Sequence, residues 1–156
     1  MISFDDFQAN CARVRKRVEE ACNQAKRPLA EVSILPVTKF HPLAAVEFAK
    51  RAGFDRVGEN RVQEAVDKQT ESALDIRWDL IGQLQSNKAK MAAEHFDRIQ
   101  SVDRLKLLAK LNQAAEAAGK SLAVLLQVNA GDDPAKAGVS CEEADRLLEA
   151  ALAMPA

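Results

Sequence analysis

Residues 33–42, "SILPVTKFHP", form a short apolar run that ends in a lysine and is then stopped by a proline. β-branched and other apolar residues over 32–38 predict a short buried strand. Residues 43–53, "LAAVEFAKRAG", are typical of a helix that ends at Gly53. A strand followed by a helix is one βα unit, with Lys39 at the carboxyl end of its strand.

The same unit recurs along the rest of the chain. Further strands are predicted within 54–60, 76–84, 96–102 and 122–130, and helices within 61–73, 86–95, 104–119 and 140–154. A long amphipathic helix, whose apolar stripe runs from Phe4 to Cys22, precedes them all. Apolar strands that alternate with amphipathic helices indicate a parallel sheet with right-handed crossovers.

Polar residues before four of these helices predict N-terminal caps. Ser3 followed by Asp6 suits an N-terminal cap, Ser140 with Glu143 has the spacing of a capping box, and Asn60 with Gln63 is placed like a capping pair. Asp103 is predicted to cap the helix after the fourth strand.

Two architectures fit a leading helix followed by five βα units: a doubly wound open sheet, and part of a (β/α)8 barrel. The glycine-rich phosphate loops of nucleotide-binding folds are absent after the first strand, which weakens the first alternative. A barrel normally needs about 250 residues. The 156 residues would therefore hold about five of its eight units.

Composition excludes several classes of protein. The net charge of −1 gives no basis for binding nucleic acid or an anionic membrane surface, and no apolar run is long enough to span a bilayer. The N-terminal residues 1–16 lack the basic start and apolar block of a signal peptide. The three cysteines form no CxxC pair, which disfavours a disulfide framework or a zinc site. We expect a cytoplasmic, reducing setting without a metal.

In either architecture the ligand site lies at the carboxyl ends of the strands. Lys39 is there, and an amine held among apolar walls can form a Schiff base with an aldehyde; the alternative is a lysine that extends to solvent from the rim. Asn60 of "GEN" can hydrogen-bond a ligand, or serve only as a cap. Ser86 and Asn87 stand at a predicted helix start, where backbone N–H groups can hold an anion.

Taken together, the segments at the strand ends closely resemble the pyridoxal 5′-phosphate homeostasis protein family. The segments that carry the resemblance are "VTKFHP", "VGENRVQEA", "WDLIGQLQSNKAK", "IQSVDRLKLLAKLN" and "LLQVNAGDDPAKAG". It implies an α/β fold, a (β/α)8 barrel like the N-terminal domain of alanine racemase, here incomplete. It also implies that pyridoxal 5′-phosphate (PLP) is held as a Schiff base on Lys39, with Asn60 beside it. Members are expected to balance intracellular PLP without secure catalytic turnover.

The chain departs from the family pattern at several positions. His41 replaces a second lysine, and Asp79 and Gln83 replace histidines, whereas Lys136 matches a family lysine. Family members continue through about three more strands that hold the phosphate. We therefore expect residues 1–156 to be the N-terminal part of a PLP-binding barrel. Its exposed strand edges would favour self-association or pairing with a complementary segment.

Three rival functions stay open. A PLP-dependent racemase needs a second acid–base group, a tyrosine in that fold, and the chain contains no tyrosine. A Schiff-base aldolase without a cofactor would place its lysine on a later strand. The last alternative is a fragment that binds no cofactor.

Overall fold

The computed structural model describes residues 2–72 and 74–156, and its elements alternate along the chain as the periodicity predicts. The helices are α1 (Phe4–Gln24), α2 (Ala44–Arg51), α3 (Val62–Glu71), α4 (Ala89–His95), α5 (Leu105–Ala117) and α6 (Cys141–Leu152). The strands are β1 (Arg56–Glu59), β2 (Arg77–Leu80), β3 (Arg98–Val102) and β4 (Ala123–Leu126). Two 3-10 turns, η1 (Leu29–Glu31) and η2 (Ser86–Lys88), complete the order.

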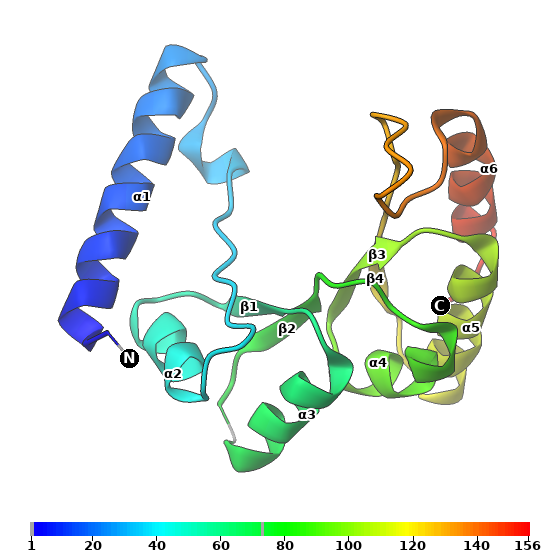
Figure 1. The fold of residues 1–156 in the computed structure, drawn as a ribbon, viewed down its shortest axis with the longest axis horizontal. Helices are drawn as coiled ribbons and strands as arrows, with labels where there is room; N and C mark the ends of the chain where they lie inside the picture. Colours follow the sequence, from blue (N-terminus) through cyan, green and yellow to red (C-terminus); the bar gives the residue numbers. More distant parts are fainter. Residues whose placement is uncertain (1, 73) are drawn as a thin grey trace.

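The four strands form one parallel sheet in the order β1-β2-β3-β4 (Figure 1). Gly58 pairs with Asp79, Leu80 with Ile99, and Ile99 with Val124. Sequential parallel strands joined by helices are the arrangement expected from the repeated βα units, so the predicted α/β class with parallel strands is confirmed.

The first predicted strand, over 32–38, is not formed as a strand. The segment joins β1 through one parallel bridge between Val37 and Gly58. Its hydrogen bonds run from the Thr38 N–H to the Gly58 carbonyl (3.0 Å) and from the Gly58 N–H to the Pro36 carbonyl (2.8 Å). Pro36 has no N–H with which to continue a ladder of hydrogen bonds along β1. The β-branched residues over 32–38 therefore form an extended segment beside β1, which we call the edge segment.

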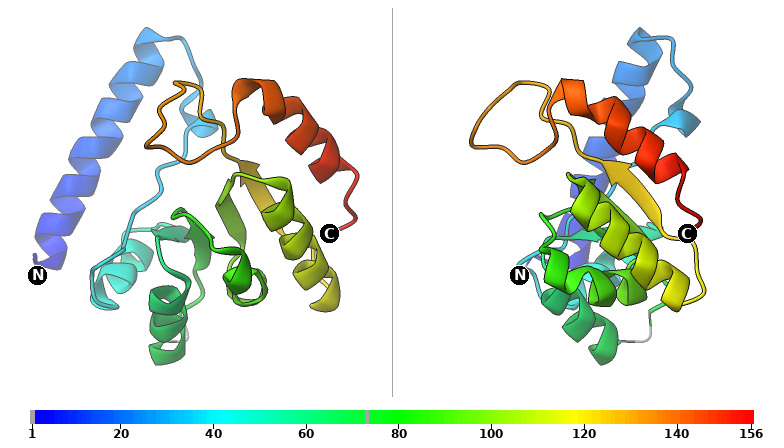
Figure 2. Two further views of the ribbon diagram at one scale, coloured as in Figure 1. Left: turned by 45° about the vertical axis from the view of Figure 1, so that its right-hand side comes forward. Right: turned by 90° about the vertical axis from the view of Figure 1, so that its right-hand side faces the viewer.

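The two faces of the sheet differ. Helices α2 to α5 lie along one side of the strands, and Val57, Leu80 and Ile99 are fully buried beneath them (Figure 2). We call this side the covered face. Val37 and Leu125 belong to the other side, the open face, and remain 45% and 46% exposed. The core therefore lies between the strands and the helices.

Two of the four predicted helix caps are confirmed. The Ser3 hydroxyl accepts from the Asp6 N–H in a full capping box, and Ser140 accepts from the Glu143 N–H. The predictions for Asn60 and Asp103 are wrong, because in each helix the N-cap position falls one residue later, on an arginine in extended conformation. Neither arginine caps its helix through its side chain.

None of the helices within residues 2–72 and 74–156 combines the length and apolarity needed to cross a bilayer.

Candidate functional site

Lys39 lies in a tight turn immediately after the edge segment. The His41 N–H donates to the Thr38 carbonyl (3.1 Å), and Phe40 adopts a positive φ of 61°. A positive φ is rare for a large L-residue and persists only where neighbouring groups hold it. The turn brings the Lys39 Nζ to 5.8 Å from the centre of the Phe40 ring, whose other neighbour is the Arg61 guanidinium at 5.5 Å.

Two residues of α3 hold the backbone on both sides of Lys39. The Lys68 Nζ donates to the Thr38 carbonyl (2.9 Å), and the Phe40 N–H donates to Glu64 Oε1 (2.6 Å). Lys68 also donates to that same Glu64 oxygen (3.0 Å). The peptide groups before and after the lysine are thus tied to one helix, which fixes the direction in which the Lys39 side chain leaves the turn.

Glu59 anchors this arrangement from β1. Its side chain is fully buried on the covered face, and its Oε1 accepts from the Thr38 hydroxyl (2.6 Å) and from the Lys68 Nζ (2.7 Å). Its Oε2 is buried without a hydrogen-bond partner among the described residues. We call Thr38, Glu59, Glu64 and Lys68 the turn clamp. A charge this deeply buried needs its counter-charge, so the four residues act as a unit.

The clamp also alters the acidity of Glu64. Partial burial alone raises the pKa of this carboxyl, but the hydrogen bonds from Lys68 and the Phe40 N–H act against it. The positive charges of Lys68 and Arg61 add to their effect, and the net result is a pKa below its ordinary value of 4.5. Glu64 is therefore ionised at neutral pH, as its contacts require.

Asn60, the second predicted site residue, is half-buried where β1 ends. The loop after β2 packs closely on it, because a Cβ on Gly82 would lie 2.3 Å from the Asn60 carbonyl oxygen. Only glycine fits there, and the Gly82 carbonyl in turn accepts from the Ser101 hydroxyl (2.6 Å). The ends of the first three strands are thereby fixed against one another.

A cavity of about 550 Å³ opens beside Asn60 at this carboxyl edge, and we call it the mouth cavity. Its polar lining consists of the carboxamides Asn60, Gln63, Gln83 and Gln85 and the basic side chains Arg61, Lys88 and Arg104. Gln83, which stands where the family pattern has a histidine, thus lies at the mouth.

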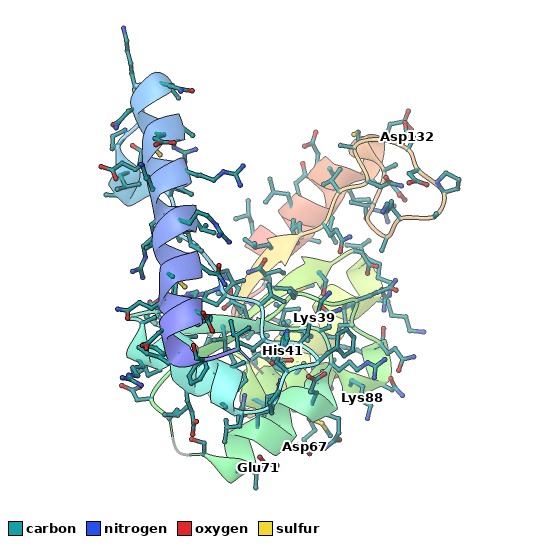
Figure 3. The ribbon with its side chains drawn as sticks, turned by 60° about the vertical axis from the view of Figure 1, so that its left-hand side comes forward. Lys39, His41, Asp67, Glu71, Lys88 and Asp132 are labelled. Carbon is teal, nitrogen blue, oxygen red and sulfur yellow. The ribbon has the colours of Figure 1, made fainter. Side chains whose placement is uncertain are left out.

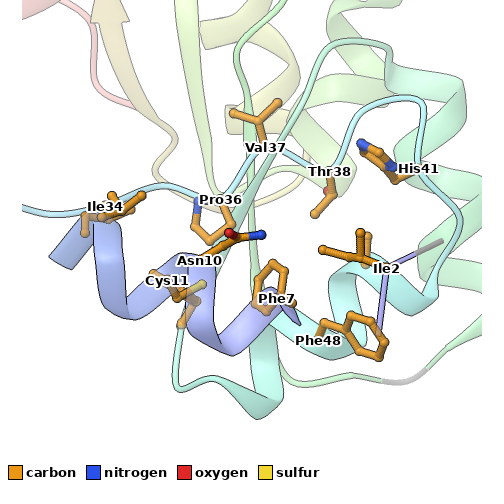
Figure 4. Close-up of a pocket in the computed structure, with 13 residues that line it drawn as sticks. Ile2, Phe7, Asn10, Cys11, Ile34, Pro36, Val37, Thr38, His41 and Phe48 are labelled. Atoms are coloured by element: carbon orange, nitrogen blue, oxygen red, sulfur yellow. The ribbon is translucent and has the colours of Figure 1, made fainter. Parts of the chain in front are cut away.

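A second cavity, of about 590 Å³, lies between α1, the edge segment and α2 (Figure 4). Its wall is mostly apolar, with Phe7, Cys11, Pro36 and Phe48 among the lining residues. Such a wall suits hydrocarbon rather than a phosphorylated ligand. Lys39 is not among the lining residues of either cavity.

The other predicted candidates are more scattered. His41 and His95 are exposed, as predicted, and His95 contacts the Gln69 side chain. The Ser86 hydroxyl, predicted to stand at an anion site, accepts a hydrogen bond from the Arg104 Nη2 (3.2 Å). Lys136 is exposed on the loop that also carries Asp132, which Figure 3 shows projecting beyond the strands.

Asp79, the other position where a histidine is replaced, belongs to the open face. It is fully buried, and it accepts from Arg56 (2.8 Å) on β1 and from Arg98 (2.9 Å to Nε) and Gln100 (2.7 Å) on β3. Asp79 therefore joins three strands. In this chain the position has a structural role as an ionic cross-link.

Sequence reasoning missed the turn clamp and the basic lining of the mouth cavity. Glu64 and Lys68 have the i, i+4 spacing of a helical ion pair, which was a usable signal. No spacing in the sequence indicated that Arg61, Lys88 and Arg104 would line one cavity, because each residue follows a different strand.

Comparison with known proteins agrees with this geometry. The family model for the alanine racemase N-terminal domain matches residues 2–156. The pyridoxal phosphate homeostasis protein of Escherichia coli K12 is 37% identical over 97% of this chain and 67% of its own length. That of Pseudomonas aeruginosa is 43% identical over 94% of this chain and 64% of its own.

Solved structures give the same result. PipY of Synechococcus elongatus with PLP bound is 36% identical with a TM-score of 0.74, over 88% of this chain and 65% of that one. A Bifidobacterium adolescentis protein of unknown function has a TM-score of 0.89 at 30% identity, covering 99% of this chain and 68% of that one. Alanine racemase of Clostridium difficile, at 14% identity and a TM-score of 0.69, shows the shared fold alone.

The chain spans about two-thirds of the length of these homeostasis relatives. Their identity and coverage confirm the resemblance drawn from the strand-end segments. The chain therefore belongs to the alanine racemase N-terminal domain family and, within it, to the pyridoxal phosphate homeostasis proteins.

Proposed function

We propose that this protein binds PLP as part of intracellular PLP homeostasis, and that Lys39 is the residue that bonds covalently to the cofactor. The relatives are named for PLP homeostasis, and one structural neighbour was solved with PLP bound. The observation that carries the proposal is the turn clamp, which ties the peptide groups on both sides of Lys39 to α3. Such restraint orients an amine for attack on a ligand.

The residues around Lys39 suit this role. When bound, PLP supplies an aldehyde that condenses with a primary amine and releases water. Within residues 2–72 and 74–156, no carboxylate forms an ion pair with the Lys39 amine, and its nearest aromatic neighbour is Phe40. An amine without a competing carboxylate is available to a ligand. Asn60 at the same edge offers a neutral amide as a hydrogen-bond partner.

The proposed function is binding without catalytic turnover. The fold is shared with racemases, which are enzymes. Racemisation requires a second acid–base group on the far side of the ring, and this chain provides no tyrosine for that purpose. We therefore propose cofactor binding and release in the cytoplasm.

We also propose that residues 1–156 form one domain, the N-terminal part of a barrel. The edge segment and β4 leave the sheet open on both sides, and Val37 and Leu125 of the open face are half exposed. Such edges favour pairing with another chain. A monodisperse monomer in native-state sizing would contradict self-association.

The test is chemical trapping. PLP is added to the 156-residue chain, the visible absorbance band is recorded, the adduct is reduced with borohydride, and the modified lysine is mapped. We expect labelling at Lys39 that is lost in Lys39→Ala and retained in Lys90→Ala, a control at an exposed lysine of α4. Labelling spread over surface lysines, unchanged by Lys39→Ala, would overturn the proposal.

A further inference from the structure

The mouth cavity has a feature that binding at Lys39 does not use. Its charged lining residues, Arg61, Lys88 and Arg104, are all basic, although the whole chain has a net charge of −1. A cavity lined by one sign of charge concentrates ions of the other sign. It lies where the carboxyl ends of parallel strands meet, which is the usual place for a ligand.

Arg104 is held in position at this site. Its Nη2 donates to the Leu84 carbonyl (2.9 Å) and to the Ser86 hydroxyl (3.2 Å), and its Nη1 pairs with the adjacent Asp103. These contacts place the guanidinium against the loop after β2. Asp103 offsets much of its charge, so Arg104 contributes a fixed wall and a donor rather than a full free charge.

Arg61 and Lys88 contribute positive charge that no ion pair takes up. Within the described parts of the chain, neither has a carboxylate within 4.0 Å, although the charge of Arg61 also acts on Glu64. They approach the cavity from two sides, Arg61 from the start of α3 and Lys88 from the end of η2. Two unpaired cations that face the same cavity repel each other, and an anion between them removes that cost.

The ten-residue helix α3 adds a third contribution. It begins beside the cavity at Val62, and its N-cap residue Arg61 provides no side-chain cap. The N–H groups of the first turn thus donate no hydrogen bond to that side chain. Free N–H groups at a helix start, next to two cations, favour an anion that has several acceptor oxygens.

We propose that the mouth cavity is a non-covalent binding site for the phosphate group of a small phosphate monoester. A phosphate monoester carries close to two negative charges and three acceptor oxygens, which matches the two cations without an ion pair, the fixed Arg104 and the helix start. Carboxamides complete the wall and can contact the rest of the ligand. Because Lys39 is not a lining residue, this site does not depend on the proposed bond to Lys39.

The test uses pyridoxamine 5′-phosphate, whose amine replaces the aldehyde and which therefore cannot form a Schiff base with lysine. Binding to the 156-residue chain is measured by calorimetry at low and high salt. We expect saturable binding. Lys88→Met or Arg61→Gln should weaken it about tenfold, which is about 1.4 kcal/mol. Binding should also weaken as salt rises.

Lys90→Met is the matched control, since Lys90 is an exposed lysine two residues beyond Lys88 and pairs with Glu94. Thermal unfolding of each variant confirms that it is folded. Equal affinity of Lys88→Met and Lys90→Met would overturn the proposal, as would equal binding of pyridoxamine without its phosphate. Loss of binding in Lys39→Ala, with binding retained in Lys88→Met and Arg61→Gln, would also overturn it. The trapping experiment at Lys39 gives a separate result, so either proposal can fail alone.

Discussion

Glu59 and Asp79 are both fully buried carboxylates, and they lie on opposite faces of the same sheet. The register pairs Asp79 with Gly58, the residue before Glu59, so their side chains point in opposite directions. Glu59 points to the covered face and is neutralised by one lysine of α3. Asp79 points to the open face and is shared between two arginines and a glutamine.

The difference shows how each face satisfies a buried charge. Under the helices, Glu59 pairs with Lys68, which is only 8% exposed, while one Glu59 oxygen has no partner among the described residues. On the open face Arg56 and Arg98 are 18% and 30% exposed, so each keeps contact with water while it binds Asp79. The buried carboxylate of the covered face therefore depends on one ion pair, whereas the buried carboxylate of the open face is bound by three side chains.

The largest expected effect comes from breaking the pair on the covered face. Lys68→Met leaves Glu59 charged, buried and without its cation, which we expect to reduce the free energy of unfolding by about 3–5 kcal/mol. Urea denaturation followed by circular dichroism measures the change. Adding Glu59→Gln to Lys68→Met should recover part of the loss, because it removes the unpaired charge.

Lys90→Met serves as the control for that experiment, since the Lys90 side chain is 83% exposed and we expect a change below about 0.5 kcal/mol. If Lys68→Met destabilised the protein no more than the control, the ion pair between Lys68 and Glu59 would not stabilise the fold, and the turn clamp would not be ionic.

A smaller effect is expected on the open face. Asp79→Asn keeps the shape of the side chain but removes its charge, and we expect a cost of about 1–3 kcal/mol. The cost is lower than for Lys68→Met because water can reach the two arginines. Asp75→Asn is the control, since Asp75 is fully exposed. A loss larger than that of Lys68→Met would reverse the comparison between the two faces.

The smallest effect concerns the pH dependence of the clamp. The pKa of Glu64 is lowered in the folded protein, so its contribution to stability is complete above its ordinary value of 4.5 and is lost as pH falls through the folded-state pKa. The stability difference between wild type and Glu64→Gln, below about 1 kcal/mol, should therefore shrink between neutral pH and pH values under 4.5.

Asp67→Asn provides the comparison for Glu64→Gln, because Asp67 lies on the same helix and its side chain accepts a hydrogen bond from Gln63, with no other hydrogen bond to it among the described residues. Unfolding at a series of pH values measures both variants. A pH-independent difference for Glu64→Gln would show that its charge has no part in the clamp.

Local patterns predicted most of the fold. The periodic apolar residues located the six helices and the four strands, and Gly53 and Gly119 follow helices with positive φ as predicted. Three local predictions failed. The segment that contains Pro36 gained one bridge rather than a ladder, because proline has no N–H to donate. Asn60 packs against Gly82 and does not cap α3, and Asp103 does not cap α5.

The order of the βα units, the family and the position of Lys39 at the end of its segment could be predicted from the amino acids alone. These follow from local periodicity and from segments of distinctive composition. Two features became visible only in the folded chain: Lys68 and Glu64 hold the turn around Lys39, and Arg61, Lys88 and Arg104 line one cavity. Buried charges and anion sites arise from residues distant in sequence, whose meeting depends on how the strands align.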